Sequence, residues 1–415
     1  MSGKDAVCGS QSRQDLTKIK ECIREDIIRC MNRERVVSDE EIKDMIQQRV
    51  LDLGHEMYFS VTQKQEMIQG IFNSLRKLDI LQEILEQDDV TEIMVNGYQT
   101  IFIEKAGRLY RYPHSFSSQS KLEDVIQQIV SRMNRVVNEA SPIVDVRLED
   151  GSRVNVVLPP VAINGPILTI RKFPNQPITI QTLIEIGSIT REAAEFLKSL
   201  VIAGYNIFIS GGTGSGKTTF LNALSCFIPE TERLITVEDS ANLVRLEARE
   251  ANLEGKNAVS IRDLLRSALR MRPDRIILGE VRDAAACELL TAMNTGHDGS
   301  LSTGHANSPQ DMLNRLETLV LMGMDIPLEA VRSQIASAID IVVQLGRLRD
   351  RSRKVLTIAE VSGMQEGHIV LRDIFQFQER GEAEDGTVVG NLQWTGAKLS
   401  QTTKLELAGV KVPCG

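Results

Sequence analysis

A glycine-rich segment in the middle of the chain carries residues suited to binding phosphate. It matches the P-loop pattern G-x-x-x-x-G-K-S/T, and it reads Gly211, Gly212, Thr213, Gly214, Ser215, Gly216, Lys217 and Thr218. The apolar run Asn206–Ser210 precedes it, and a helix is predicted over Thr219–Phe227. Glycines let successive backbone N–H groups face one anion, and a helix N-terminus adds its dipole. We therefore expect this segment and Thr219 to bind a nucleotide.

Two side chains at the end of the segment define the expected ligand further. Lys217 supplies a positive charge for the β- and γ-phosphates, and the Thr218 hydroxyl is a ligand for Mg²⁺. The alternative is a glycine-rich turn that binds nothing. A chance match in a chain of this length is on the order of a few per cent, and the strand–loop–helix context lowers it further. The expected ligands are ATP and Mg²⁺, although no base-reading motif excludes GTP.

Carboxylates follow two predicted strands, at the edge where open α/β sheets place their ligands. Glu238 and Asp239 follow one strand, and Glu280 follows another. One acid is expected to hold the metal through water, and the other to polarise the attacking water. The alternative is a helix N-cap, which suits Asp239 and Asp283. For Glu238 and Glu280 we favour the catalytic role, because the P-loop fixes the site nearby.

Two of the five histidines stand in a pair of Thr-Gly-His triplets, Thr295–His297 and Thr303–His305. We expect both triplets to end at the same edge of the sheet, as a γ-phosphate sensor or a subunit contact. The ordinary alternative is a hydrogen-bonded core histidine. A metal site is disfavoured, because no cysteine or third histidine shares a compatible spacing.

Apolar runs and helical patterns alternate from about residue 180, which is typical of an α/β fold with a mostly parallel sheet and helices on both faces. The predicted strands are Tyr205–Ser210, Arg233–Glu238, Arg275–Leu278, Ser300–Gly304 and Ile341–Leu345. A further strand at Val355–Val361 predicts a hairpin whose turn carries Arg347, Arg349, Arg351, Arg353 and Lys354. We favour a solvated turn over a surface for acidic loops or anionic headgroups.

Two modules are predicted before this core. Apolar residues at helical spacing and a capping box at Ser38–Glu41 indicate a helical module over residues 1–78. Short β-runs, and a helix opened by a second capping box at Ser120–Glu123, indicate an α+β domain over 79–175. Phe173–Pro177 is the expected linker. The ATPase domain is expected over 176–375, and a polar tail over 376–415.

Composition limits the classes of protein. The 48 basic and 56 acidic residues leave a net charge of −8, which argues against nucleic acid as the main partner. Aromatic residues make up 4%, which argues against a stacking platform for single strands. The six cysteines form no C-x-x-C pair, so neither a zinc ribbon nor a disulfide framework is indicated. With no signal-like start and no long apolar run, the chain is expected to be soluble.

Four motifs in order resemble those of the type II/type IV secretion ATPases. They are GGTGSGKTT as the Walker A motif, ITVEDSANL as the Asp box, IILGEVRD as Walker B and TGHDGSLSTGH as the His box. TEIMVNG, from Thr91 to Gly97, is similar to the CpaF-like branch, the ATPases of tight-adherence (Tad) pilus assembly. The resemblance implies a hexameric ATP hydrolase whose active site lies between a PAS-like N-terminal domain and a RecA-like C-terminal domain.

The same resemblance assigns roles to residues. It implies that Glu238 positions or activates the attacking water, that Glu280 holds Mg²⁺ through water, and that His305 is the main His-box residue. Arg153 and Arg171 match arginines that family members place against the γ-phosphate, where they stabilise developing charge. Their ordinary alternative is an exposed strand arginine. No aspartate ends the Walker B strand, so the division of roles between Glu238 and Glu280 stays open.

The sequence therefore predicts a Mg²⁺-dependent, homohexameric ATPase that powers pilus assembly or protein secretion by domain rotation. Its expected partners are inner-membrane platform proteins of a pilus or secretion machine, with no nucleic acid. Its expected place is the cytoplasm, at the inner face of the cell membrane. Two alternatives stay open: a RecA-like nucleic-acid motor and a non-hydrolysing, nucleotide-gated scaffold.

Overall fold

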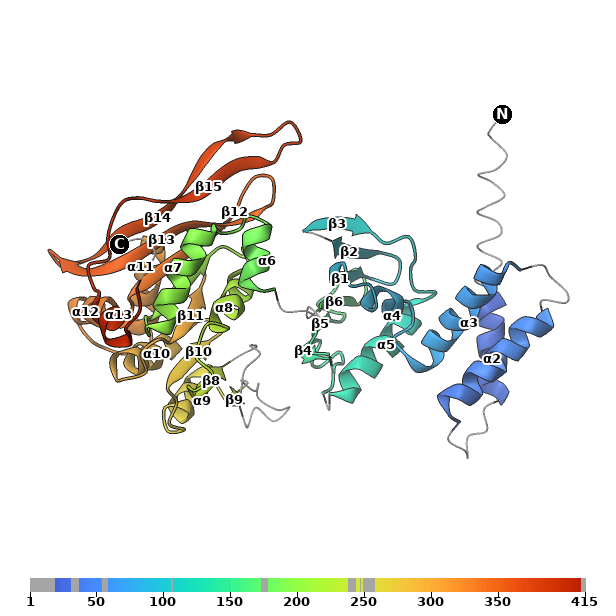
Figure 1. Ribbon diagram of the computed structural model, residues 1–415. Helices are drawn as coiled ribbons and strands as arrows, with labels where there is room; N and C mark the ends of the chain where they lie inside the picture. Colours follow the sequence, from blue (N-terminus) through green and yellow to red (C-terminus); the bar gives the residue numbers. More distant parts are fainter. Residues whose placement is uncertain are drawn as a thin grey trace. The chain divides into compact units, whose positions relative to one another are not determined.

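The computed structural model (Figure 1) describes residues 19–30, 37–53, 59–105, 107–133, 135–148, 150–172, 178–237, 244–246, 248 and 258–411. The chain divides into two compact units, Met1–Asn175 and Gln176–Gly415. Each unit contains hydrophobic cores of its own.

Three helices begin the described part of the first unit: residues 19–30, α2 (Asp39–Leu53) and α3 (Val61–Arg76). They enclose a small apolar core made of Ile23, Ile27, Ile42, Ile46, Val50, Phe59, Met67, Ile71 and Phe72. At the start of α2, the Glu41 N–H donates to Ser38 Oγ at 3.2 Å, and the Ser38 N–H donates to Glu41 Oε2 at 3.0 Å. The capping box predicted at this position is confirmed.

A six-stranded antiparallel sheet follows in the same unit, in the order β3-β2-β1-β6-β5-β4. Its buried face packs against α5, as the shared core of the strands and that helix shows. The elements are α4 (Ile80–Leu85), β1 (Val90–Asn96), β2 (Ile101–Lys105), β3 (Arg108–Arg111), α5 (Gln119–Arg132), β4 (Ile143–Arg147), β5 (Arg153–Val157) and β6 (Ile167–Arg171).

Two details of this sheet differ from the sequence prediction. The N-cap of α5 is Ser118, whose side chain accepts the Lys121 N–H at 3.2 Å. The capping box predicted at Ser120–Glu123 is therefore wrong, because a hydroxyl two residues earlier caps a longer helix. β4 was not predicted, because Asp145 interrupts its apolar pattern. It lies at the edge of the sheet, where such a residue is tolerated.

The second unit is built on a nine-stranded sheet in the order β15-β14-β13-β12-β7-β11-β10-β8-β9. The pairs from β12 to β9 are parallel, and those from β12 to β15 are antiparallel. The strands are β7 (Ile207–Gly211), β8 (Leu234–Val237), β9 (Val244–Leu246), β10 (Arg275–Leu278), β11 (Leu301–Gly304), β12 (Ile341–Arg347), β13 (Arg353–Gln365), β14 (His368–Glu382) and β15 (Val388–Trp394).

Helices cover both faces of this sheet, as the α/β prediction requires (Figure 1). They are α6 (Ile180–Glu185), α7 (Arg191–Ile202), α8 (Lys217–Ser225), α9 (Ile261–Ala268), α10 (Ala285–Asn294), α11 (Pro309–Leu321), α12 (Leu328–Ala338) and α13 (Thr403–Ala408). Side chains of β7 alternate between two cores: Ile207 and Ile209 lie in one, and Phe208 lies in the other. β7 is therefore held from both sides.

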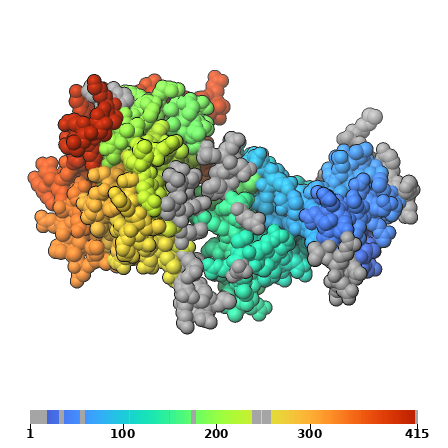
Figure 2. Space-filling model, turned by 60° about the horizontal axis from the view of Figure 1, so that its bottom comes forward, coloured from blue at the N-terminus to red at the C-terminus, as the bar shows by residue number. Residues whose placement is uncertain are grey.

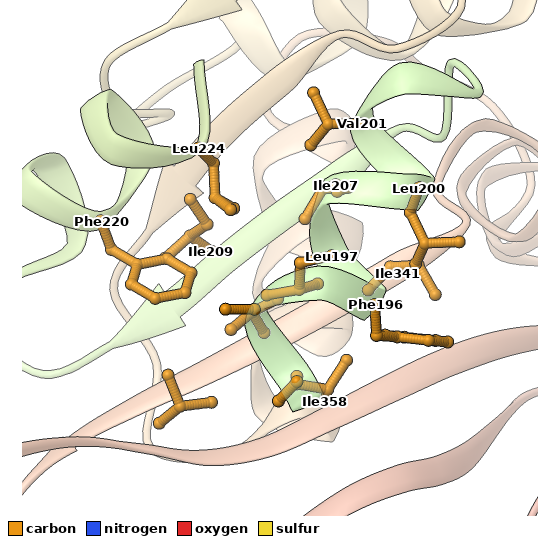
Figure 3. Packing of buried hydrophobic residues seen from close by; sticks show 14 of the residues in the cluster. Phe196, Leu197, Leu200, Val201, Ile207, Ile209, Phe220, Leu224, Ile341 and Ile358 are labelled. Atoms are coloured by element: carbon orange, nitrogen blue, oxygen red, sulfur yellow. The ribbon is translucent and has the colours of Figure 1, made fainter. Parts of the chain in front are cut away.

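The core that contains Ile207 and Ile209 is formed with α7 and α8. Figure 3 shows Leu197 and Leu200 of α7 and Phe220 of α8 gathered around these two strand residues. Each fully buried side chain of this kind contributes about 1.5–3 kcal/mol of transfer free energy. This packing fixes the strand that leads into the glycine-rich segment.

Of the residues after 375, the described ones, up to 411, belong to the second unit's sheet and core rather than to a separate tail. β14 runs across the expected boundary, and β15 extends the same sheet. Near the C-terminus, the buried carboxylate of Glu360 accepts the N–H groups of Ser400 and Gln401, and Leu405 enters the core. In Figure 2 the C-terminal residues, in red, lie against the green surface of the same unit. The boundary expected at residue 375 is therefore wrong, because the apolar face of the last strands completes the sheet's core.

Candidate nucleotide-binding site

The P-loop lies at the carboxyl end of β7, which pairs with β11 on one side and β12 on the other. Gly214 and Gly216 have positive φ angles of 71° and 93°, a conformation that glycine adopts without strain. α8 begins directly afterwards at Lys217, so its first N–H groups lie next to the loop. Thr218 is exposed and Thr219 is half-buried in the first turn of this helix. The arrangement predicted for Gly211 to Thr219 is the strand–loop–helix that binds anions.

Lys217 is buried and already holds several groups together. Its Nζ donates to the carbonyl oxygens of Gly211 and Gly212 at 3.0 and 2.9 Å. Nζ of Lys217 also lies 3.2 Å from Nδ1 of His305. A phosphate that binds Lys217 must replace one or more of these partners, since an ammonium group has three N–H donors.

Glu280 and His305 meet at the ends of two paired strands, β10 and β11. Nε2 of His305 lies 3.1 Å from Oε1 of Glu280, and Nη2 of Arg282 donates to Oε2 of Glu280 at 2.8 Å. Burial opposes ionisation of Glu280, but the Arg282 hydrogen bond and the positive charges of Arg282 and Lys217 outweigh it and lower the pKa of Glu280. Glu280 is therefore ionised at neutral pH.

The hydrogen bonds also fix the protonation of His305. Because Lys217 has only donors, Nδ1 of His305 accepts, and the ring proton resides on Nε2, from which it is donated to Glu280. Burial, followed by the charge of Lys217, lowers the pKa of His305. His305 is thus a neutral bridge between the P-loop lysine and the Walker B carboxylate.

His297 does not join His305. It stands before β11, whereas His305 follows that strand, so the two lie at opposite edges of the sheet. Nδ1 of His297 lies 3.2 Å from the carbonyl oxygen of Ala292 at the end of α10. The prediction that both triplets end at one edge is wrong, because the intervening strand of four residues spans about 13 Å at 3.3 Å per residue.

The two acids predicted after β8, Glu238 and Asp239, lie outside the described residues. β8 itself ends at Val237, directly opposite Leu278 of β10. Asp283 accepts the Ala285 N–H at 2.8 Å, but the N-cap of α10 is Ala284, so the N-cap role considered for Asp283 is wrong. Arg282 was not predicted as a site residue. The sequence feature that could have identified Arg282 is its position two residues after Glu280.

Arg153 and Arg171 are brought together within the first unit. They are direct cross-strand partners on β5 and β6, and both are exposed. The same row continues to Arg147 on β4 and to Glu92 on β1. Directly opposed residues share one face of an antiparallel sheet, so the three arginines form a cationic row that the sequence did not reveal.

The residues at the P-loop fit a magnesium ion. Thr218 offers a hydroxyl in the first turn of α8, and the ionised Glu280 offers a carboxylate. Mg²⁺ prefers oxygen ligands, keeps several waters and is bound through one or two carboxylates plus substrate phosphates. Across the described ranges, no cluster of three or more His, Cys, Asp or Glu side chains forms a protein-only metal site.

The described helices are all too short or too polar to cross a membrane.

Fold and site together define a RecA-like P-loop core, and comparison with known proteins adds the family. Residues 75–384 match the family model of the type II/IV secretion system protein. A putative conjugal transfer protein of Mycobacterium tuberculosis is 34% identical over 326 residues, covering 75% of this chain and 92% of that protein. The chain belongs to the type II/IV secretion system protein family.

Other relatives have related names. The conjugal transfer protein TrbB of Rhizobium radiobacter is 32% identical over 299 residues, covering 71% of this chain and 91% of its own length. Among solved structures, the VirB11 ATPase of the Brucella suis type IV secretion system is 26% identical. It covers 69% of this chain and 94% of its own, with a TM-score of 0.36.

Proposed function

We propose that this chain is a Mg²⁺-dependent ATP hydrolase that powers pilus assembly or protein secretion. The observation that carries the proposal is the chain of contacts Lys217–His305–Glu280 at the P-loop, which joins a phosphate-binding lysine to an ionised carboxylate. The names of the relatives, which include conjugal transfer and type IV secretion proteins, support a role in transport across an envelope.

The roles of the site residues follow from their chemistry. The P-loop amides and Lys217 bind the phosphates, and His305 senses the γ-phosphate through its contact with Lys217. A magnesium ion held by Thr218, and through water by Glu280, would neutralise charge on the β- and γ-phosphates. We propose that Glu238 orients the attacking water, because the resemblance to the family assigns it that role.

The arginines of the first unit complete the proposed site. Arg153 and Arg171 would stabilise the charge that develops as the γ-phosphoryl group leaves, with the nucleotide held between two domains of a hexamer. ATP contacts from both domains favour a closed arrangement, and loss of the γ-phosphate removes part of that preference. Hydrolysis would thereby drive domain rotation.

We place the protein in the cytoplasm, at the inner face of the membrane, on platform proteins of a Tad-type pilus or a related secretion machine. The CpaF-like motif TEIMVNG supports this branch. A PAS-like fold for the first unit's sheet and helices belongs to the same proposal.

Phosphate release measured over a range of protein concentrations, together with sizing in ATP and in ADP, tests this function. We expect specific activity to rise with concentration as rings form. A stable monomer with constant specific activity would contradict the ring. Stimulation by DNA or RNA would instead favour a nucleic-acid motor, and nucleotide binding without phosphate release would favour a scaffold.

A further inference from the structure

The cationic turn between β12 and β13 is anchored on the protein. Arg349 pairs with Glu379 at 2.7 Å and with Glu382 at 3.1 Å, both on β14. Asp350 accepts hydrogen bonds from the N–H and hydroxyl of Ser352 and from the N–H of Val388. The turn is therefore anchored on the protein, while Arg347, Arg349, Arg351 and Arg353 are exposed, in agreement with the solvated turn favoured from the sequence.

Arg353 extends from this turn to the P-loop. Its Nε donates to the carbonyl oxygen of Gly214 at 2.9 Å, and its Cδ would lie 3.5 Å from a Cβ placed on Gly216. Its backbone is fixed as well, because its carbonyl accepts the Ser188 hydroxyl at 2.7 Å and the Val355 N–H donates to the Ser188 carbonyl at 2.9 Å. β13 thus positions the guanidinium group of Arg353 next to the P-loop.

A donor on the Gly214 carbonyl affects how the loop binds an anion. Backbone N–H groups face an anion only when the carbonyls of those peptides point elsewhere, so a hydrogen bond to such a carbonyl favours the anion-binding conformation. The donor here is charged, which makes the hydrogen bond stronger than a neutral one. Its charge also lies beside the loop that holds the expected phosphates.

The rest of the guanidinium group is available to a ligand. Arg353 is exposed, and among the described residues its Nη1 and Nη2 atoms have no hydrogen-bond or ion-pair partner. Planar guanidinium groups bind phosphate oxygens in pairs. We propose that Arg353 is a positioning residue of the nucleotide site, which orients the P-loop through Gly214 and adds positive charge for a nucleoside triphosphate. This inference rests on the proposed function.

The test compares the full-length protein with Arg353→Met and Arg353→Lys, using a fluorescent ATP analogue for Kd and phosphate release for KM and kcat. Methionine keeps an aliphatic chain of similar length but removes the charge and the donor. We expect Kd and KM to rise about tenfold in Arg353→Met, with a smaller change in kcat. Arg353→Lys should show a smaller rise, because it keeps the charge without the planar donor. Arg349→Ala is the matched control and should bind normally.

An unchanged Kd and KM in folded Arg353→Met would overturn the inference. Should that variant not fold, Arg353→Lys decides in the same way: a raised Kd supports the role of Arg353, and an unchanged Kd contradicts it. Absence of nucleotide binding by the unaltered protein would be a failure of the proposed function instead. The two failures are therefore distinguishable.

Discussion

Lys217, His305 and Glu280 form a row joined by contacts of 3.2 and 3.1 Å, in which the donors of Lys217 set the tautomer of His305. Phosphate oxygens compete with His305 for the ammonium group of Lys217. A bound triphosphate would therefore change the hydrogen bonds of His305, and through them the environment of Glu280. At the scale of single residues, this coupling is the feature that distinguishes the site from a simple phosphate-binding loop.

The lowered pKa of His305 predicts how the stability of the folded protein depends on pH. Burial and the charge of Lys217 lower its pKa in the folded protein, whereas the unfolded chain has the ordinary value near 6.5. The unfolded state therefore binds this proton more tightly than the folded state does. The contribution of neutral His305 to the stability of the folded protein is fully present above its pKa in the unfolded state, and it is lost as the pH falls toward its pKa in the folded state. We expect the thermal midpoint to fall less between about pH 7.5 and 5.5 in His305→Gln than in the unaltered protein.

The control for this prediction is His368→Gln, which changes an exposed histidine on β14. It should keep the pH dependence of the unaltered protein. The pKa of Glu280 is also lowered, but its contribution to the stability of the folded protein is lost only at more acidic pH. It therefore does not affect the comparison between about pH 7.5 and 5.5. If the thermal midpoint falls equally with pH in the unaltered protein and in His305→Gln, then His305 is not a neutral bridge between Lys217 and Glu280.

Among the secondary-structure elements, β7 carries the P-loop, and neighbouring strands and side chains enclose it on every side. A Cβ added to Gly211 would lie 2.5 Å from Ser215 Oγ and 2.7 Å from the backbone oxygen of Leu345 on β12. A Cβ added to Gly212 would meet no atom within 4 Å. The end of the strand therefore requires glycine at one position and tolerates a side chain at the next.

We expect Gly211→Ala to lower the free energy of unfolding by about 1–3 kcal/mol through overpacking, and Gly212→Ala to change it little. Thermal unfolding of both variants measures the difference. Similar midpoints for the two would mean that β7 and β12 separate easily, contrary to the packing described here.

The parallel core could be predicted from the sequence because each of its main strands is a short apolar run bounded by turns or helices. β10 matches its predicted range, Arg275–Leu278, and β11 differs by one residue at its start. Contacts between distant segments could not be predicted. Arg353 is 139 residues from Gly214, and no local pattern indicates which arginine of a cationic turn reaches the loop. His297 shows the converse, since a repeated motif suggested a proximity that the strand prevents.

At the scale of the whole molecule, the proposed mechanism needs groups from both units. The P-loop, Glu280 and His305 belong to the second unit, and the row of Arg147, Arg153 and Arg171 belongs to the first. An arginine that stabilises a departing phosphoryl group contributes about 10³–10⁵ in rate. Hydrolysis would therefore depend on how the units and subunits assemble.

We expect Arg153→Ala and Arg171→Ala each to reduce kcat by about 10³ or more, with little change in nucleotide affinity. Arg108→Ala alters an exposed arginine on β3 of the same sheet and should keep normal activity. Steady-state hydrolysis by the three variants provides the comparison. Normal kcat in both Arg153→Ala and Arg171→Ala would exclude them as contributors to catalysis.

Phosphate release from Mg-ATP by the unaltered protein, Lys217→Ala and Glu280→Gln tests the proposed ATPase activity directly. We expect measurable release by the unaltered protein, a loss of nucleotide binding in Lys217→Ala, and a fall in rate of about 10²-fold or more in Glu280→Gln. No release by the assembled, unaltered protein, or an undiminished rate in Glu280→Gln, would contradict the proposal.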